Sequence, residues 1–385
     1  MSDYLAFTDQ ARIDSGDPAT HAIVIGVGKY PHLNGGTGDL TTLDGGLKQL
    51  SSPPASAREI TTWLLDEFNN VDRPLASVSL LISEQDGPQP FAHPRLAAPF
   101  TPEEATIAHV KQAVKDWKKL GDKNEDNLVL FFFCGHGVAS GLDGMTLLVS
   151  DYGKDNSMPM EGAVDFAAMH RGMAQCKASY QCYFVDACRT VDDIASTTTA
   201  KGHPIIQDNL NRPWASDWNY AILYSTLAGE KAYGRKNKPS FYTEELILGL
   251  NGTGSNNRNG AGAWRVSTND LSTAMQRGLA YRGKKLKPPM ANMVNFEFHE
   301  LKADPVVPVW VYCRDPDDTE KARFKCLQAG NIVSARPPQP GTWRHEIPHG
   351  LYDFFAEVDT RSGKRENEIV MPPYQEVEIV VEDTP

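Results

Sequence analysis

A histidine and a cysteine, which together can act as a base and a nucleophile, each follow an apolar segment of the chain. His136 stands within the sequence CGHG, directly after the apolar run 127–134, and Cys188 stands within DACRT, directly after the run 180–187. A thiolate is the reactive form of cysteine, and a nearby imidazole activates it and protonates a leaving amine. Either residue alone is more often structural than catalytic, so the prediction of nucleophilic acyl transfer depends on the pair.

The elements that have to position this pair follow an α/β pattern. Short apolar runs, typical of buried strands, alternate with segments whose apolar residues recur at helical spacing. The predicted strands are 21–27, 77–82, 127–134, 146–150, 180–187 and 220–225, and the predicted helices are 56–68, one starting at Thr101 as N-cap, 163–176, 241–250 and 268–279. The alternation predicts a mostly parallel sheet flanked by helices. Ligands of such sheets bind outside the carboxyl ends of the strands, where His136 and Cys188 both fall.

The two ends of the chain differ from this core. Residues 1–20 are polar and irregular, and we interpret them as an N-terminal arm. After about residue 300 the helical spacing stops, and short apolar runs at 306–312, 332–334, 352–358 and 377–381 are separated by Pro, Gly and Asp. This pattern predicts a small all-β, sandwich-like domain. The expected organisation is therefore an arm (1–20), an α/β domain (21–300) and a β domain (301–385).

Composition and charge restrict the expected partners. The net charge of −11 argues against a general nucleic-acid binder and against an anionic membrane surface. No segment has the roughly 20 consecutive apolar residues of a membrane span, and the N-terminus lacks the pattern of a secretory signal. Six cysteines in 385 residues, with no C-x-x-C pair, are too sparse for a disulfide framework. We therefore expect a reduced, cytoplasmic protein.

The sequence DACRT, with His136 located 52 residues upstream of its cysteine, resembles a known signature. Caspases carry Q-A-C-[RQG]-G at the nucleophile, with the histidine about 50 residues before it. The strings YST at 224–226 and FYT at 241–243, and the first strand with its two glycines and Tyr30, are similar to the same family. The chain thus resembles the caspase and metacaspase superfamily of cysteine peptidases, as a bacterial caspase-like member. The resemblance covers about residues 21–298 and excludes the β tail.

The resemblance implies a role for each site residue. Cys188 is the expected nucleophile and His136 the general base and acid, while the backbone N–H groups of Gly137 and Cys188 form the oxyanion hole. Each such donor typically lowers the barrier by about 3 kcal/mol. The implied activity is that of a cysteine endopeptidase, and family-level inference extends it to a regulated bacterial death or defence pathway. Cys134, Cys176 and Cys182 have no such setting, and we interpret them as structural.

The preferred P1 residue of the substrate is predicted from the family positions that bind it. Caspases that cleave after Asp hold the substrate carboxylate with arginines, and this chain has other residues at those positions. The chain has no Arg between Gly28 and Ala57, and the position of another family arginine holds Gly234, next to Arg235. Asp186 replaces the family Gln two residues before the nucleophile, as in metacaspases, which implies cleavage after Arg and, second, Lys. The alternative is that Asp186 caps a loop or pairs with Arg189. Further expected substrate-binding residues are Asp39, with Asp44 as a weaker candidate, Ser225 and Tyr233.

The segment between Cys188 and the next strand contains two basic residues, Lys201 and Arg212. In relatives this region is a site of maturation, so an enzyme that cleaves after basic residues has two candidate self-cleavage sites here. Self-cleavage would be contradicted by a Cys188→Ala protein that still appears as two fragments.

One further motif suggests a metal site, and two alternatives to an active protease are considered. The sequence HEIPH at 345–349 matches the zinc motif H-E-x-x-H, but its Pro348 is incompatible with the helix that the motif requires. We therefore expect no metal site and no cofactor, with calcium dependence undecided. The expected partners are a protein substrate and an activating protein. The alternatives are a catalytically silent scaffold and a latent protease that a partner activates, with the β tail as the binding module.

Overall fold

The computed structural model describes residues 4–140, 144–187, 201–207, 217–225, 235–257, 262–282 and 290–383. Contact clustering divides the chain into two compact units, 1–247 with 278–298, and 248–277 with 299–385. The predicted boundary near residue 300 differs from this division, because 248–277 group with the β tail. In the second unit the turn at 249–253 packs on the strand that begins at Val306, and a Cβ on Gly252 would lie 2.8 Å from Pro305 Cβ.

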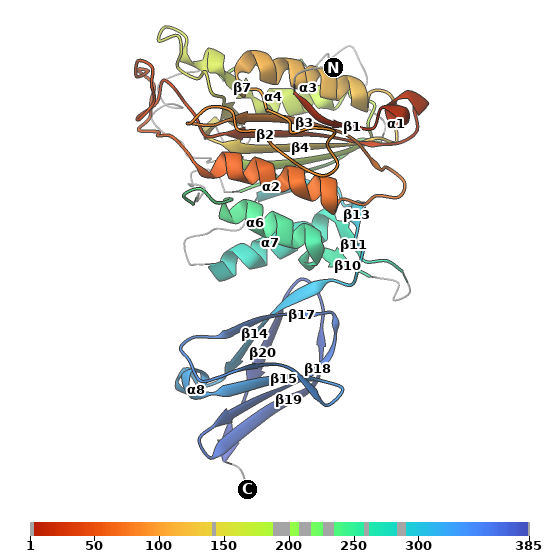
Figure 1. Ribbon diagram of the computed structural model, residues 1–385, viewed down its shortest axis with the longest axis vertical. Helices are drawn as coiled ribbons and strands as arrows, with labels where there is room; N and C mark the ends of the chain where they lie inside the picture. Colours follow the sequence, from red (N-terminus) through yellow and green to blue (C-terminus); the bar gives the residue numbers. More distant parts are fainter. Residues whose placement is uncertain are drawn as a thin grey trace. The chain divides into compact units, whose positions relative to one another are not determined.

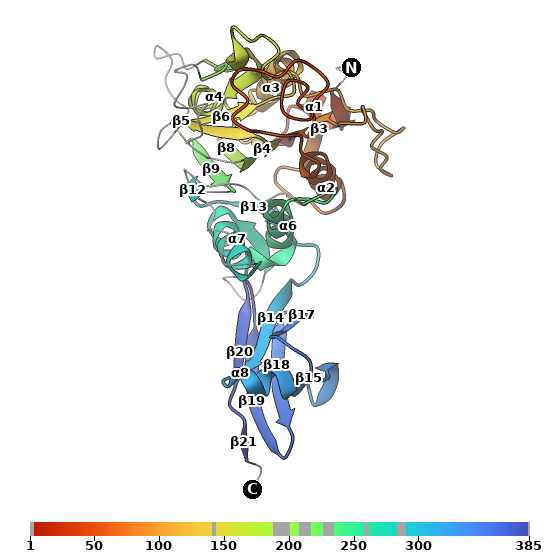
Figure 2. The same ribbon diagram turned by 90° about the vertical axis from the view of Figure 1, so that its left-hand side faces the viewer.

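The first unit contains a seven-stranded sheet with the order β1-β3-β2-β4-β8-β9-β12. The strands are β1 (Leu5–Thr8), β2 (Thr20–Val27), β3 (Leu75–Ser83), β4 (Leu128–Gly135), β8 (Tyr180–Ala187), β9 (Asn219–Tyr224) and β12 (Met290–Met293). All neighbours are parallel except the two edge strands, β1 and β12, which run antiparallel to theirs. The succession from β4 to β12 can be followed in Figure 2. The predicted mostly parallel sheet is confirmed.

Helices cover both faces of this sheet (Figure 1). On one face, α3 (Ile107–Gly121) and α4 (Phe166–Met173) bury apolar side chains against alternate residues of β2, β4 and β8 in one core. On the other face lies α2 (Ser52–Asp66), which approaches β2 so closely that a Cβ on Gly26 would lie 2.6 Å from the carbonyl oxygen of Pro53. The strands are buried on both faces, which explains why they appear in the sequence as continuous apolar runs.

The remaining elements of the α/β part are short or lie near the division between the units. A three-stranded sheet has the order β5-β6-β7, and another has the order β10-β11-β13. The bounds are α1 (Gln10–Ser15), β5 (Gly137–Ser140), β6 (Gly144–Leu148), η1 (Pro159–Gly162), β7 (Ala163–Asp165), α6 (Phe241–Leu248), η2 (Gly249–Thr253), β10 (Ser255–Asn256), β11 (Arg265–Ser267), α7 (Thr268–Arg282) and β13 (Glu297–Glu300). Among the described residues, no helix is long and apolar enough to cross a membrane.

The C-terminal unit confirms the predicted β-sandwich-like fold. One sheet has the order β17-β14-β20 and the other β16-β15-β18-β19-β21, and the buried apolar residues of both form one core. The elements are β14 (Val306–Cys313), α8 (Pro316–Lys321), β15 (Arg323–Gln328), β16 (Asn331–Arg336), β17 (Trp343–Pro348), β18 (Gly350–Val358), β19 (Arg361–Val370), β20 (Gln375–Ile379) and β21 (Glu382–Asp383). His345 and His349 therefore lie on and just after a strand, and not on the helix that a zinc motif needs.

Three predictions about local structure are wrong. Residues 1–20 are not an irregular arm, because β1 pairs with β3 at the sheet edge and α1 follows it. The helix expected to begin at Thr101 begins instead after Thr106, whose hydroxyl accepts from the His109 N–H at 3.3 Å. Residues 101–105 stay extended because Glu103 bridges to Leu81 of β3. The first residues of the helix expected from 163 form β7 instead.

Candidate active site

The carboxyl ends of β4 and β8 lie side by side in the middle of the sheet. The register of these parallel strands aligns Cys134 with Asp186 and Gly135 with Ala187. His136 is the next residue after β4, and the chain continues from Ala187 into Cys188, which lies outside the described residues. The two segments that the sequence analysis selected therefore end at the same edge, one residue before His136 and one residue before Cys188.

The imidazole of His136 is buried and bound to a backbone carbonyl. Its Nε2 lies 2.6 Å from the carbonyl oxygen of Lys48, and only 6% of the residue is exposed. Because a carbonyl oxygen can only accept a hydrogen bond, Nε2 carries the proton in this contact. In the neutral ring Nδ1 is then the nitrogen that accepts a proton. The Lys48 carbonyl thus fixes both the orientation and the tautomer of the ring.

Tyr30 contacts His136 from a second side. The backbone N–H of His136 donates to the Tyr30 hydroxyl at 2.8 Å, and this hydroxyl donates to the carbonyl of Leu148 at 3.2 Å. The two rings are tilted, with centroids 4.8 Å apart, and Tyr30 is fully buried. A Cβ at position 135 would lie 2.8 Å from the Tyr30 hydroxyl oxygen, so the tyrosine packs closely because that residue is Gly135.

Asp186 is buried and receives three hydrogen bonds on one carboxylate oxygen. Its Oδ2 accepts from the Cys134 thiol at 3.2 Å, from the Thr243 hydroxyl at 3.3 Å and from the Ser240 hydroxyl. Only 3% of the residue is exposed. Burial raises the pKa of Asp186, and the hydrogen bonds from Ser240, Cys134 and Thr243 oppose that rise. The carboxyl group is held in place by groups from β4 and from the start of α6.

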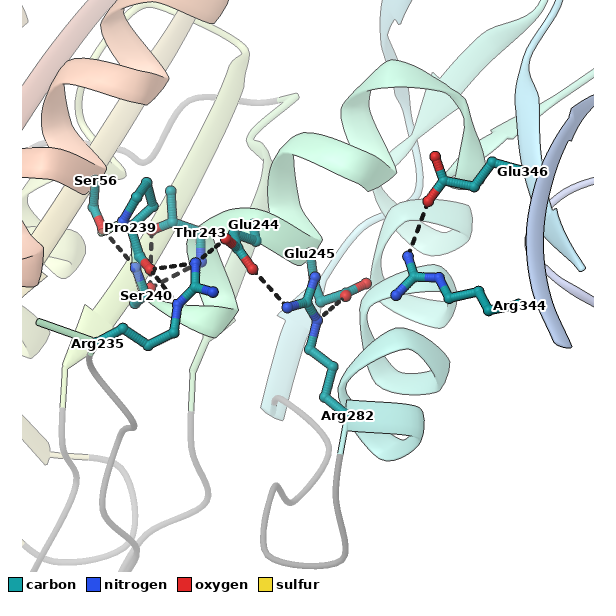
Figure 3. A network of polar contacts seen from close by, with 10 residues as sticks. All are labelled: Ser56, Arg235, Pro239, Ser240, Thr243, Glu244, Glu245, Arg282, Arg344 and Glu346. Carbon is teal, nitrogen blue, oxygen red and sulfur yellow. Dashed lines mark hydrogen bonds and ion pairs between the residues drawn. The ribbon is translucent and has the colours of Figure 1, made fainter. Parts of the chain in front are cut away.

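The start of α6 connects this carboxyl group to α2, which lies on the same face of the sheet. The Ser240 hydroxyl accepts from the backbone N–H of Thr243 at 3.0 Å, as an N-cap residue does, and the Ser240 N–H donates to the Ser56 hydroxyl of α2 at 3.1 Å. Ser56, Ser240 and Thr243 can be seen together in Figure 3. Ser240 and Thr243 were not predicted as site residues, although a serine directly before a predicted helix is a recognisable signal.

Comparison with known proteins identifies the family of the chain. The family model Peptidase C14, caspase domain, matches residues 19–299. The chain belongs to this caspase family. A crystal structure of caspase-1 from Spodoptera frugiperda is similar, with a TM-score of 0.41 and 12% identity, over 74% of this chain and 92% of that chain. The uncharacterized protein y4kE of Sinorhizobium fredii is 23% identical over 188 residues, or 49% of this chain and 52% of that protein. The chain thus spans about half the length of this curated relative.

Arg235, the arginine next to Gly234, has partners within the caspase domain. The guanidinium of Arg235 donates to the carbonyl of Pro239 at 3.2 Å and pairs with Glu244 (Figure 3). It also lies over the Phe241 ring, 4.9 Å from its centroid. The other side of Glu244 pairs with Arg282 at 2.6 Å. These contacts hold Arg235 at the start of α6.

The other predicted substrate-binding residues differ in how closely they approach this edge. Ser225 follows β9, is buried, and donates to the carbonyl of Ala187 at 3.1 Å, so it adjoins the residue before Cys188. Asp39 is exposed in the loop after β2. Asp44, in the same loop, accepts from the Asn34 amide at 2.8 Å and the Gly46 N–H at 3.2 Å, which is a turn contact. Tyr233 lies outside the described residues.

The five cysteines of the described ranges are all buried. Burial raises the thiol pKa of Cys176 to about 12, of Cys313 to about 11 and of Cys326 to about 12, and it also raises that of Cys182. The thiol of Cys134 donates a hydrogen bond to the carboxylate of Asp186. A thiol with a raised pKa is almost entirely protonated at neutral pH and is a poor nucleophile. Within the described ranges, no group of three or more His, Cys, Asp or Glu side chains is arranged to hold a metal ion.

Proposed function

We propose that this caspase-domain protein is a cysteine endopeptidase that cleaves after Arg and, less efficiently, after Lys. Cys188 is the nucleophile, and His136 is the general base and acid. The observation that carries the proposal is the β4–β8 register, which aligns Gly135 with Ala187 directly before these two residues. The buried thiols of the described cysteines support it further, because they leave Cys188 as the candidate for a reactive thiolate.

The proposed reaction uses the proton-accepting nitrogen of His136. Transfer of the Cys188 proton to Nδ1 gives the thiolate, which attacks the carbonyl carbon and forms a C–S bond. The imidazolium then protonates the departing amine as the C–N bond breaks, and an acyl-enzyme thioester remains. His136 next takes a proton from water, whose oxygen displaces the thiolate and releases the acid. The hydrogen bond from Nε2 to Lys48 stabilises the imidazolium in both steps.

The backbone N–H groups of Gly137 and Cys188 are proposed to stabilise the oxyanion. Gly137 directly follows His136 and begins β5, where it pairs with Leu147 of β6. A glycine next to the histidine lets the substrate backbone approach closely. Each donor aimed at the developing charge contributes about 3 kcal/mol, so two such donors account for much of the barrier reduction.

Asp186 is proposed to bind the basic P1 side chain. Its carboxyl group is buried at the carboxyl end of β8, and the hydroxyls of Ser240 and Thr243 fix its orientation. A guanidinium pairs with a carboxylate through two parallel hydrogen bonds, whereas an ammonium binds as a point charge, so Arg is preferred to Lys. The ion pair between Arg235 and Glu244 supports this choice, because the guanidinium of Arg235 already has a carboxylate partner.

The test is a set of peptides that differ only at P1, with Arg, Lys, citrulline, Asp or Ala. We expect kcat/KM to decrease in the order Arg, Lys, citrulline, with no cleavage after Asp. The assay is run with calcium, with a chelator and with cell lysate, since a calcium requirement or an activating partner would otherwise hide the activity. Efficient cleavage after Asp would contradict the role of Asp186. No cleavage under all of these conditions would favour the scaffold function, in which the β tail binds a partner.

If the enzyme processes itself, we expect cleavage after Arg212 rather than after Lys201. The Lys201 carbonyl accepts from the Thr146 hydroxyl at 3.1 Å, and His203 exchanges two backbone hydrogen bonds with β7 at 2.8 and 3.0 Å. Cleavage requires an extended peptide in the active site, so the segment at Lys201 would first have to leave β7. Arg212 lies outside the described residues.

We expect Arg212→Ala to abolish the processed fragments and Lys201→Ala to leave their amount unchanged, as measured by gel electrophoresis and intact mass. Loss of processing in Lys201→Ala alone would contradict this assignment. Fragments that persist in Cys188→Ala would show that another protease produces them.

A further inference from the structure

The side chain of Gln49 binds both backbone groups of Tyr30. Its Oε1 accepts from the Tyr30 N–H at 2.8 Å, and its Nε2 donates to the Tyr30 carbonyl at 2.7 Å. The same Nε2 has weaker contacts with the carbonyls of Asn34 at 3.4 Å and Leu33 at 3.5 Å. A carboxamide that satisfies one donor and one acceptor of the same residue fixes the two chain segments relative to each other.

These two segments carry the two groups that contact His136. Tyr30 provides the hydroxyl that accepts the His136 N–H, and Lys48, the residue before Gln49, provides the carbonyl that accepts from Nε2. Gln49 therefore connects Tyr30, which accepts from the backbone N–H of His136, to the segment whose carbonyl accepts from the His136 ring. It is far from His136 in the sequence, and it does not contact the ring itself.

The rest of the loop holds the segment around Lys48 less directly. Asn34 forms a bridge with Lys48, and its N–H donates to the Leu47 carbonyl at 3.2 Å. The Leu50 N–H donates to the Gly28 carbonyl at 2.9 Å. These contacts hold the chain on either side of Gln49, while the connection to Tyr30 itself is made by the Gln49 side chain.

We propose that Gln49 is a positioning residue for His136. By holding Tyr30 and the Lys48 carbonyl at a fixed separation, it keeps Nε2 as the protonated nitrogen and leaves Nδ1 as the nitrogen that accepts a proton. This inference rests on the proposed His136–Cys188 function. A displacement of about 1 Å of a catalytic group can reduce the rate about 100-fold, so loss of the Gln49 contacts reduces kcat and leaves substrate binding nearly unchanged.

The test compares Gln49→Met with Gln85→Met in the full-length protein. Methionine keeps the approximate size of the side chain and removes its hydrogen bonds. Gln85 is a matched control, because it is exposed and its Nε2 donates to the Leu50 carbonyl of the same loop at 3.1 Å. For each variant, kcat and KM are measured with an Arg peptide. The pH dependence of Cys188 alkylation by iodoacetamide is measured as well, with Cys188→Ala as the blank.

We expect Gln49→Met to lower kcat at least about tenfold, with KM within about twofold. The midpoint of Cys188 alkylation should move to higher pH, because the imidazolium that stabilises the thiolate loses its fixed acceptor. The titratable side chains at the ends of neighbouring strands, Cys134 and Asp186, are unchanged in both variants. The control Gln85→Met should match the wild type in both measurements.

Two outcomes would overturn the inference. One is a Gln49→Met protein with wild-type kcat and alkylation midpoint, and the other is an equal loss in Gln85→Met, which would indicate general loosening of the loop. His136→Ala distinguishes these from a failure of the proposed function. If His136→Ala does not change the alkylation midpoint, His136 is not the partner of Cys188, whereas a change in His136→Ala without one in Gln49→Met rejects only the role of Gln49.

Discussion

Replacing Cys188 by alanine is expected to lower kcat/KM for an Arg peptide by at least about 10⁴-fold, to the background rate. Loss of the nucleophile removes the covalent route, and losses of about 10⁴–10⁶ are typical when one member of a nucleophile–base unit is removed. Because the two residues act as a unit, His136→Ala should be nearly as inactive, and the double variant no worse than Cys188→Ala. The measurement is steady-state hydrolysis, with active-site labelling to count competent enzyme.

The control for this prediction is Cys176→Ala. Cys176 is fully buried in the first unit, and burial raises its thiol pKa to about 12. Its replacement removes a cysteine without removing a thiolate, so activity should stay within a few-fold of the wild type. The thermal unfolding of each variant shows whether it is folded. A folded Cys188→Ala protein that still cleaves the Arg peptide would exclude Cys188 as the nucleophile.

The second large effect is expected from Asp186→Asn. Removing one partner of a buried charge pair typically costs about 3–5 kcal/mol, so kcat/KM for the Arg peptide should decrease about 10²–10⁴-fold. A citrulline peptide has the same shape and no charge, and its cleavage should change much less. The ratio of the two kcat/KM values therefore isolates the charge interaction from any general damage to the site.

The stability of the same variant provides an internal control. Burial raises the pKa of Asp186 in the folded state, so the folded protein binds this proton more tightly than the unfolded chain does. The contribution of Asp186 to stability is therefore complete below the ordinary Asp pKa of about 3.9 and is lost as the pH rises through the raised folded value. Asn carries no charge, so Asp186→Asn should gain in Tm relative to the wild type over this range of increasing pH.

The matched acidic control is Asp39→Asn. Asp39 is exposed in the loop after β2, where a charge contributes little to binding. Its replacement should leave the preference for Arg over citrulline within about threefold. If Asp186→Asn kept the wild-type preference while Asp39→Asn lost it, the P1 pocket would be formed by the loop and not by the end of β8.

The sequence was sufficient to predict the strands that carry the site. β8 has the predicted bounds, and β4 is shifted by one residue, because both are continuous apolar runs bounded by polar residues. The helix start at Thr106 was not predictable in the same way. Thr101 and Thr106 both have capping chemistry, and the bridge between Glu103 and Leu81 selects the second by keeping the preceding residues extended.

For the site itself, the sequence alone identified the residue types that carry chemistry and the strand ends that present them. His136, Cys188 and Asp186 were recognisable as candidates because a histidine, a cysteine and a carboxylate follow or end apolar strands and match the caspase signature. Only the tertiary structure revealed the groups that hold His136 and Asp186. The acceptor for His136 is the backbone carbonyl of Lys48, 88 residues away, and any residue type carries such a carbonyl. The partners of Asp186 are hydroxyls more than 50 residues distant, which the fold brings together through the packing of α6 beside β8.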